Sequence, residues 1–135
     1  MEMAFKNDDK VLFENRDMLR EGGIFSDCPI GWGTLVRQLF NDIRDACKKH
    51  KSTLPLVAQV KSKFGGLCFY LDHQNDQFDE NSSAGIEVKR LIKEAEKKSY
   101  AICEITGLPG SVHIKDRWFA TLNEKKANEL GYKKA

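Results

Sequence analysis

Residues 56–72 read LVAQVKSKFGGLCFYLD and contain two strand-like runs in succession. Side-chain character alternates over residues 57–62 and again over residues 67–72, and Gly65 and Gly66 lie between the two runs. Period-2 alternation is typical of β-strands, and glycine readily takes the positive φ that a tight turn requires. The stretch therefore predicts an antiparallel hairpin that turns at the Gly-Gly pair. Both faces of the second run are apolar, so we expect this strand to be central, with packing on each side.

Helical periodicity flanks the hairpin in the sequence. From Trp32 to Lys51, apolar residues recur at helical spacing and polar residues fill the remaining positions, which predicts an amphipathic helix. A second helix is expected over residues 83–100, with an N-cap from Asn81, Ser82 or Ser83. The apolar stripes are Val36, Leu39, Phe40, Ile43, Ala46 and Cys47 in the first helix, and Val88, Leu91, Ile92, Ala95 and Ser99 in the second.

The two ends of the chain are less regular. Residues 1–31 are expected to form an irregular arm, with a short helix or a packed segment around residues 11–19. Short strands are predicted at residues 101–105, 111–114 and 117–122, followed by a closing helix at 124–130. The order of elements predicts a single α+β domain over residues 1–135, in which two main helices pack against an antiparallel sheet centred on the hairpin. Residues 101–135 form its small β-rich end.

Composition limits the possible functions. The chain has 135 residues, with 22 Lys and Arg against 20 Asp and Glu, for a formal net charge of +2. This balance argues against a polyanion binder that acts by bulk charge, although a local basic face remains possible. The N-terminus lacks the apolar region of a signal peptide and no run is long enough to cross a membrane, so we expect a soluble protein of the cytosol. Its cysteines (Cys28, Cys47, Cys68 and Cys103) are expected to be buried thiols rather than disulfides.

Sequence motifs give little support for catalysis or metal binding. The chain contains no C-x-x-C, H-x-x-x-H, P-loop, nucleophile elbow or dinucleotide fingerprint. The acidic segment 72–83 fails as a calcium loop, because Gln77 stands where glycine is needed and Ser83 where a bidentate acid is needed. We therefore expect no cofactor and no metal, and no catalytic residues. An enzyme site assembled in space around Cys68 or His113 is the remaining alternative.

Cations and aromatics interleave near the hairpin turn and near the C-terminus. Lys61 and Lys63 flank the turn, and residues 115–119 read KDRWF. Such a mixture can contact RNA or single-stranded DNA, or it can be a strand whose aromatics face the core. Trp32, between two glycines, is either an anchor of the first helix or an exposed interface residue. The residues that we predict at a partner-binding surface are Trp32, Arg37, Lys61, Lys63, Phe64, Arg117 and Trp118.

Four motifs in order carry a family resemblance. They are Gly31-Trp32, the run from Gln59 to Tyr70 (QVKSKFGGLCFY), the run 95–110 (AEKKSYAICEITGLPG) and the run 118–122 (WFATL). Together they resemble a family of small uncharacterised proteins of phages and prophages. The resemblance covers most of the chain after residue 28, and it depends on the ordered set rather than on any one motif.

The resemblance implies a small zinc-binding element, a zinc knuckle, at the C-terminal end. On this sequence its first ligand is Cys103, but the other ligand positions hold Thr106, Asn123 and Lys126. One thiolate cannot retain a structural zinc ion against water. Our hypothesis is that the chain keeps the backbone of the knuckle, at Gly107, Pro109 and Gly110, and replaces the metal with packing. Stoichiometric zinc in the purified protein would contradict this.

Three classes of function follow. The first, which we favour, is a non-enzymatic phage-encoded protein that binds and inhibits a host machine, such as an RNA-guided (CRISPR) defence effector. Its partner would be a host protein or ribonucleoprotein in the bacterial cytosol, and the oligomeric state stays open. The second is an RNA- or DNA-binding module, and the third is an enzyme. The nucleic-acid module would use Lys61, Lys63, Lys115, Arg117, Lys89, Arg90, Lys93 and Lys97.

Overall fold

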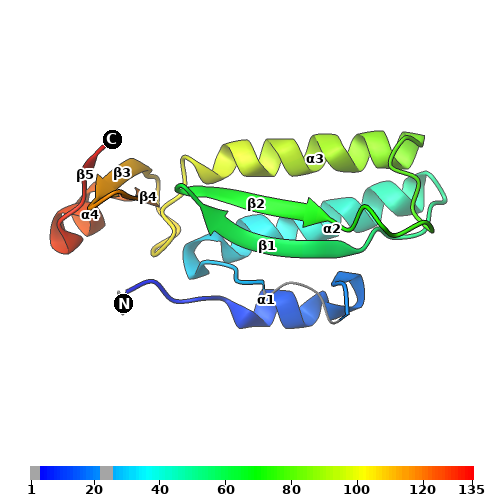
Figure 1. Ribbon diagram of the computed structural model, residues 1–135, viewed down its shortest axis with the longest axis horizontal. Coiled ribbons are helices and arrows are strands. Elements are labelled where there is room, and N and C mark those ends of the chain that lie inside the picture. Colours follow the sequence, from blue (N-terminus) through cyan, green and yellow to red (C-terminus); the bar gives the residue numbers. More distant parts are fainter. Residues whose placement is uncertain (1–3, 22–25) are drawn as a thin grey trace.

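The predicted hairpin is present in the computed structural model, which describes residues 4–21 and 26–135 (Figure 1). Strand β1 (Val57–Lys63) pairs with β2 (Gly66–Leu71) in antiparallel register, with Val60 opposite Phe69. The connection is a two-residue turn in which Phe64 and Gly65 both have positive φ, 53° and 83°. This is the type I′ pattern, whose twist suits a two-residue hairpin.

The position of the turn corrects the sequence prediction by one residue. Gly66 is not part of the turn but the first residue of β2. Glycine suits this position for a different reason, because a Cβ atom here would lie 2.3 Å from the ring of Tyr100. The residue that takes left-handed backbone geometry beside Gly65 is Phe64.

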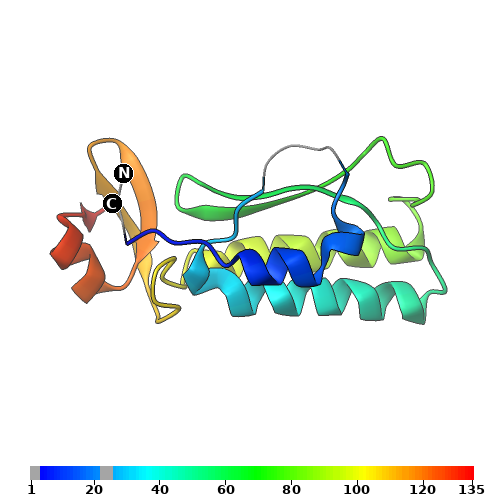
Figure 2. The ribbon, with the colours of Figure 1, turned by 90° about the horizontal axis from the view of Figure 1, so that it is seen from below.

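Two long helices pack on one side of the hairpin. Helix α2 (Gly33–Lys49) and helix α3 (Ser83–Ser99) run beside each other under β1 and β2 (Figure 2). Ser82 caps α3 by accepting a hydrogen bond from the Gly85 N–H. The apolar stripes are confirmed, because every predicted member is buried except Leu91, which is half-buried. They form the main core with Val57, Val60, Leu67, Phe69 and Leu71 from the hairpin.

The hairpin is a two-stranded sheet, so the prediction that β2 is central is wrong. Tyr70 is 41 % exposed, and Cys68 is half-buried on the face away from the helices. The apolar character of this face misled the prediction because tyrosine and cysteine tolerate partial contact with water. Side chains of α3 cover the free edge of β2, where the N–H groups of Leu67 and Phe69 donate to Ser99 Oγ (2.9 Å) and Glu96 Oε2 (3.0 Å).

The N-terminal segment covers the other edge of the hairpin. It contains α1 (Asp9–Glu14) and two 3₁₀ turns, η1 (Arg16–Met18) and η2 (Ile30–Trp32). The Arg20 N–H donates to the Val57 carbonyl at 2.9 Å, and the Asp27 N–H donates to the Val60 carbonyl at 2.8 Å. The predicted arm over residues 1–31 is therefore a packed segment, apart from residues 1–3 and 22–25, which lie outside the described part of the chain.

The C-terminal end builds a second, smaller core. Strands β3 (Ser111–Lys115), β4 (Trp118–Leu122) and β5 (Lys133–Lys134) form a sheet in the order β4-β3-β5, with α4 (Glu124–Leu130) beside it. The predicted strand at 101–105 is wrong, because Ile102 makes a single bridge to Pro109 and a turn follows. The buried residues of this second core are Cys103, Ala120, Leu122, Ala127 and Tyr132.

The fold class is thus α+β, with an antiparallel hairpin packed against helices and a small β-rich end. Within residues 4–21 and 26–135, no helix has the length and apolar character that a membrane span requires.

Candidate functional site

The tip of the first hairpin meets strand β4 where the two cores join. The Thr121 hydroxyl donates to the Gly65 carbonyl at 2.6 Å, a buried bond between the turn and β4. Gly65 is close to the backbone of β4, since a Cβ on it would lie 3.4 Å from atoms of Ala120 and Thr121. The turn residue Phe64 is therefore held in place beside β4.

Glu104 is the centre of this junction. Its carboxylate accepts hydrogen bonds from Ser62 Oγ at 2.9 Å and from the Thr121 N–H at 2.8 Å. Its carbonyl accepts from the Gly31 N–H at 2.7 Å, so the residue joins β1, β4 and the segment before α2. Glu104 is 5 % exposed, and burial raises the pKa of its carboxyl although the Thr121 and Ser62 hydrogen bonds oppose this. Sequence reasoning did not single out Glu104 as a functional residue, although it lies within the family motif at 95–110.

An aromatic pair is exposed beside the junction. Phe64 is 69 % exposed and Phe119 is 39 % exposed, and their rings meet edge-on with centroids 6.4 Å apart. Lys63 Nζ lies 5.7 Å from the centre of the Phe64 ring. Lys63 and Phe64 were predicted at a contact surface, whereas Phe119 was not, although it ends the KDRWF run. The structure brings these three residues together.

Arg117 and Trp118 are also exposed, at the turn between β3 and β4 and the start of β4. Asp116 and Arg117 form that turn with φ of 49° and 70°. Trp118 is 73 % exposed, so the interpretation that the aromatics of residues 115–119 face the core is wrong. Alternation along β4 directs Trp118 and Phe119 to opposite faces of the strand. We use the name tip surface for the exposed residues of the two turns and of the start of β4, an edge strand, on either of its faces: Lys63, Phe64, Arg117, Trp118 and Phe119.

Trp32 does not belong to this surface, and its predicted role in partner binding is wrong. The side chain is fully buried, at 0 % exposure, and its Nε1–H donates to the Ile102 carbonyl at 2.8 Å. A Cβ on the preceding Gly31 would lie 2.0 Å from the Cys103 carbonyl oxygen. The glycine therefore allows a close approach of two backbones, and the indole anchors the start of α2.

Arg37 lies away from the tip surface, in ion pairs between α2 and the N-terminal segment. Its guanidinium contacts Glu14 at 2.9 Å and Asp8 at 4.0 Å. The hydrogen bond with Glu14 raises the pKa of Arg37, and the same bond lowers the pKa of Glu14. Arg37 thus links two elements of the fold, and this geometry does not join it to the other predicted contact residues.

Lys61 lies on β1 opposite Cys68 of β2, on the face of the hairpin turned away from the helices. The sequence placed Cys68 in the core, but the thiol is half-buried beside Tyr70. A hydrogen bond with Cys68 raises the pKa of Tyr70. His113, the other residue of the alternative enzyme site, is buried in β3, where its Nδ1 lies 2.7 Å from the Ser111 carbonyl. Cys68 and His113 therefore belong to different sheets.

Cys103 lies at the position that the resemblance gives to the first zinc ligand. Its Sγ accepts a hydrogen bond from the Thr106 N–H at 3.4 Å. Burial acts to raise the pKa of this thiol. Hydrogen bonds from the Thr106 side chain and from the backbone N–H groups of Asn123, Thr106 and Ile105 outweigh burial, so the pKa of Cys103 is lowered. Across the described residues, no group of three or more His, Cys, Asp and Glu side chains is placed to hold a metal ion. The replacement of zinc by packing stays a prediction.

The remaining predicted cations fall into separate regions of the molecule. Lys115 donates to the Leu130 carbonyl at 2.8 Å and lies 5.7 Å from the Tyr132 ring, within the C-terminal end. Lys89, Arg90, Lys93 and Lys97 lie together on α3. Comparison with known proteins gives no match, either to a family model, to a curated protein or to a solved structure.

Proposed function

We propose that this protein acts by binding another protein through the tip surface, without catalysing a reaction. The sequence resemblance implies a phage or prophage setting, and in that setting we propose that the protein inhibits a host machine, such as an RNA-guided (CRISPR) defence effector. The observation that carries the proposal is the geometry of Phe64, a large aromatic residue that is 69 % exposed and held at positive φ.

The placement of Phe64 is costly for the folded chain. A left-handed conformation costs an ordinary L-residue about 1–2 kcal/mol, and glycine, asparagine or aspartate are the residues that relieve this cost in such a turn. The ring recovers only part of that cost from its contact with Phe119, because most of its surface stays in water. A residue kept in a strained and exposed position favours a role in binding.

The neighbouring residues have the composition of an interface core. Phe119 adds aromatic surface beside Phe64, and Lys63 places a cation near the Phe64 ring. Trp118 and Arg117 are exposed at the neighbouring turn of the C-terminal sheet. Aromatic residues and arginine are enriched in protein interfaces, and tryptophan and tyrosine are enriched among the few residues that dominate binding energy. The hydrogen bonds of Thr121 and Glu104 hold the turn that carries Phe64 against β4, which lowers the entropy lost on association.

The test is a capture experiment with matched variants. The protein is immobilised and exposed to a bacterial lysate, with and without ribonuclease, and bound proteins are identified. The contact variant carries Phe64→Asn and Trp118→Ala, because asparagine suits the turn. The control is Phe13→Ala, which removes an equally exposed aromatic residue (65 %) from α1.

We expect wild type and Phe13→Ala to retain the same protein partner after ribonuclease treatment. The contact variant should bind that partner at least about tenfold more weakly, the loss expected when interface anchors are removed. Equal retention by all three proteins would reject the tip surface as the contact site. Release of the partner by ribonuclease would show that RNA mediates the contact.

A further inference from the structure

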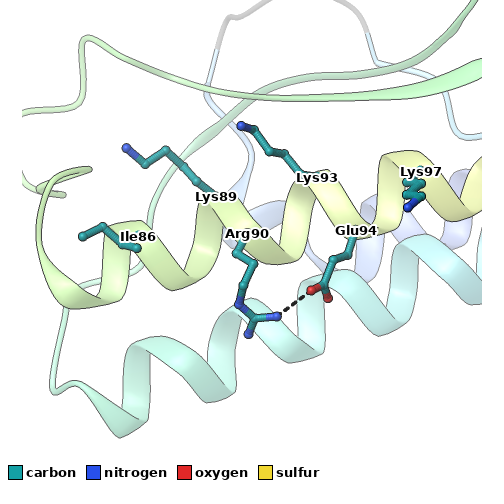
Figure 3. Close-up of a pocket in the computed structure, with 6 residues that line it drawn as sticks. All are labelled: Ile86, Lys89, Arg90, Lys93, Glu94 and Lys97. Atoms are coloured by element: carbon teal, nitrogen blue, oxygen red, sulfur yellow. Dashed lines mark hydrogen bonds and ion pairs between the residues drawn. The ribbon is translucent and has the colours of Figure 1, made fainter.

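A row of three lysines lies along the outer side of α3. Lys89, Lys93 and Lys97 are spaced four residues apart, and with Ile86, Arg90 and Glu94 they line a shallow groove (Figure 3). Figure 3 shows Lys89 and Lys93 extending from the same side of the helix, whereas Arg90 turns the other way to pair with Glu94. Residues four apart are neighbours on a helix surface, so the row is continuous.

The acids of α3 contact other groups rather than these lysines. Glu94 pairs with Arg90 at 2.7 Å, and Glu96 accepts the Phe69 N–H at 3.0 Å. Glu87 faces α2, where it contacts His50 at 2.9 Å and Lys49 at 3.2 Å. Within residues 4–21 and 26–135, no ion pair joins Lys89, Lys93 or Lys97 to an acidic side chain.

This arrangement does not serve the stability of the helix. Like charges four residues apart on a helix repel and reduce its stability. Some cations elsewhere in the fold pair with an acid, as Arg37 does with Glu14 and Arg44 does with Asp17. Although the net charge of the whole chain is only +2, positive charge is concentrated on one face of α3. Such a face attracts a polyanion even when the whole protein is nearly neutral.

We propose that this face of α3 binds the phosphate backbone of a double-stranded nucleic acid, without reading its sequence. Successive lysines rise by about 6 Å along the helix axis, a regular spacing suited to a regular row of phosphates. The groove contains no aromatic side chain on which an unpaired base could stack, which favours a duplex over a single strand. The inference is independent of the tip surface, which lies on other elements.

The test measures duplex binding as a function of salt. Fluorescence anisotropy is recorded with a labelled 20-base-pair DNA duplex, with a single strand of the same length, and with polyglutamate as the probe for an acidic protein. The α3 variant carries Lys89→Gln, Lys93→Gln and Lys97→Gln. The control carries Lys125→Gln, Lys133→Gln and Lys134→Gln, which removes the same charge from exposed lysines of the C-terminal end.

Wild type and control should bind the duplex with equal affinity at low salt, and the α3 variant about tenfold more weakly or worse. The slope of log affinity against log salt should decrease in magnitude by about 2–3 in the α3 variant, because each lost phosphate contact accounts for about 0.9. Melting curves should show that the variant stays folded.

Four outcomes would overturn the proposal. The first two are the absence of duplex binding by the wild type at low salt, and equal losses of duplex affinity in the α3 variant and the control. The third is tighter binding of the single strand than of the duplex. The fourth is binding of polyglutamate with the same affinity as the duplex, with the same loss of affinity in the α3 variant. The tip variants are expected to bind the duplex normally, so the two proposals can fail separately.

Discussion

The four cysteines differ in how far their thiols can react. Cys28 is fully buried, and burial raises its pKa to about 12. Cys47 is buried with a raised pKa, again chiefly through burial. Cys103 is also fully buried. Only Cys68 is half-buried, on the face of the hairpin away from the helices. A thiol reacts as its thiolate, and only when the reagent can reach the sulfur. We therefore expect the partly exposed Cys68 to be more reactive than the three buried cysteines.

We therefore predict that a single thiol of the native protein reacts rapidly with Ellman's reagent. All four should react in denaturant, because none is in a disulfide. Cys68→Ser should abolish the native reaction and leave three reactive thiols after unfolding. Rapid modification of the native Cys68→Ser variant would contradict the assignment and indicate local opening near a buried cysteine.

The two tryptophans show what the sequence could not predict at the scale of single residues. Both were predicted at a partner-binding surface, and each also had a structural interpretation, as a helix anchor for Trp32 and as a core residue for Trp118. Trp32 is buried as an anchor, whereas Trp118 is exposed. Both lie next to residues that permit either outcome, a glycine on each side of Trp32 and Arg117 before Trp118. Burial depends on which distant segment approaches, here Ile102 for Trp32, and that information is not local.

At the scale of elements, the strength of the local pattern decided which predictions are confirmed. The hairpin and both long helices carry sustained periodicity, and all three are confirmed. The strand predicted at 101–105 rested on a short alternation, and the backbone there turns around Cys103 instead. Strand β5 has only two residues, both lysine, and therefore gives no apolar pattern to detect.

Glu104 connects elements through a carboxylate whose pKa is raised in the folded protein by burial. Between its ordinary value of 4.5 and the higher folded value, the folded state binds more protons than the unfolded state. This group therefore favours folding at low pH, and its contribution falls as the pH rises through that window. Carboxylates with lowered pKa values, such as Glu14 and Asp17, act in the opposite direction.

We predict that Glu104→Gln gains stability relative to the wild type as the pH rises from about 4.5, and that the difference becomes constant above the folded pKa. Glutamine can still accept from the Thr121 N–H and donate to Ser62, without a buried charge. Glu104→Ala should lose about 1–3 kcal/mol, because both partners lose their hydrogen bonds. Urea unfolding at a series of pH values measures both. A difference that shrinks with rising pH would show that the buried carboxylate is stabilised in its charged form.

At the scale of the whole molecule, two apolar cores are joined by a polar seam. The first core lies between the hairpin and the helices, and the second lies under the C-terminal sheet. The bonds between them involve Gly31, Trp32, Gly65, Glu104 and Thr121, which come from distant parts of the sequence. Period and composition predict each element separately, but they do not predict this seam, because its bonds join residues far apart in the sequence, such as Trp32 and Ile102, which are 70 positions apart.

The seam makes a specific prediction about two glycines. Gly31→Ala places a Cβ 2.0 Å from the Cys103 carbonyl oxygen and 2.6–2.7 Å from the Glu104 carbonyl group, all backbone atoms that cannot move alone. We expect it to lower the free energy of unfolding by about 2–3 kcal/mol, since the two cores must separate. Gly66→Ala meets only the end of the Tyr100 ring, which is 47 % exposed and can rotate.

The loss in Gly66→Ala should be below about 1 kcal/mol, partly because alanine reduces the entropy of the unfolded chain. Denaturant unfolding followed by circular dichroism compares both variants with the wild type. Equal losses would mean that the backbone contact at Gly31 can relax, and that the two cores are less tightly coupled than the bonds of Glu104 and Trp32 indicate. A larger loss of unfolding free energy in Gly31→Ala than in Gly66→Ala would support a rigid seam. The tip surface requires such a seam, because Phe64 and Phe119 stay together only while the hairpin and the C-terminal sheet are in contact.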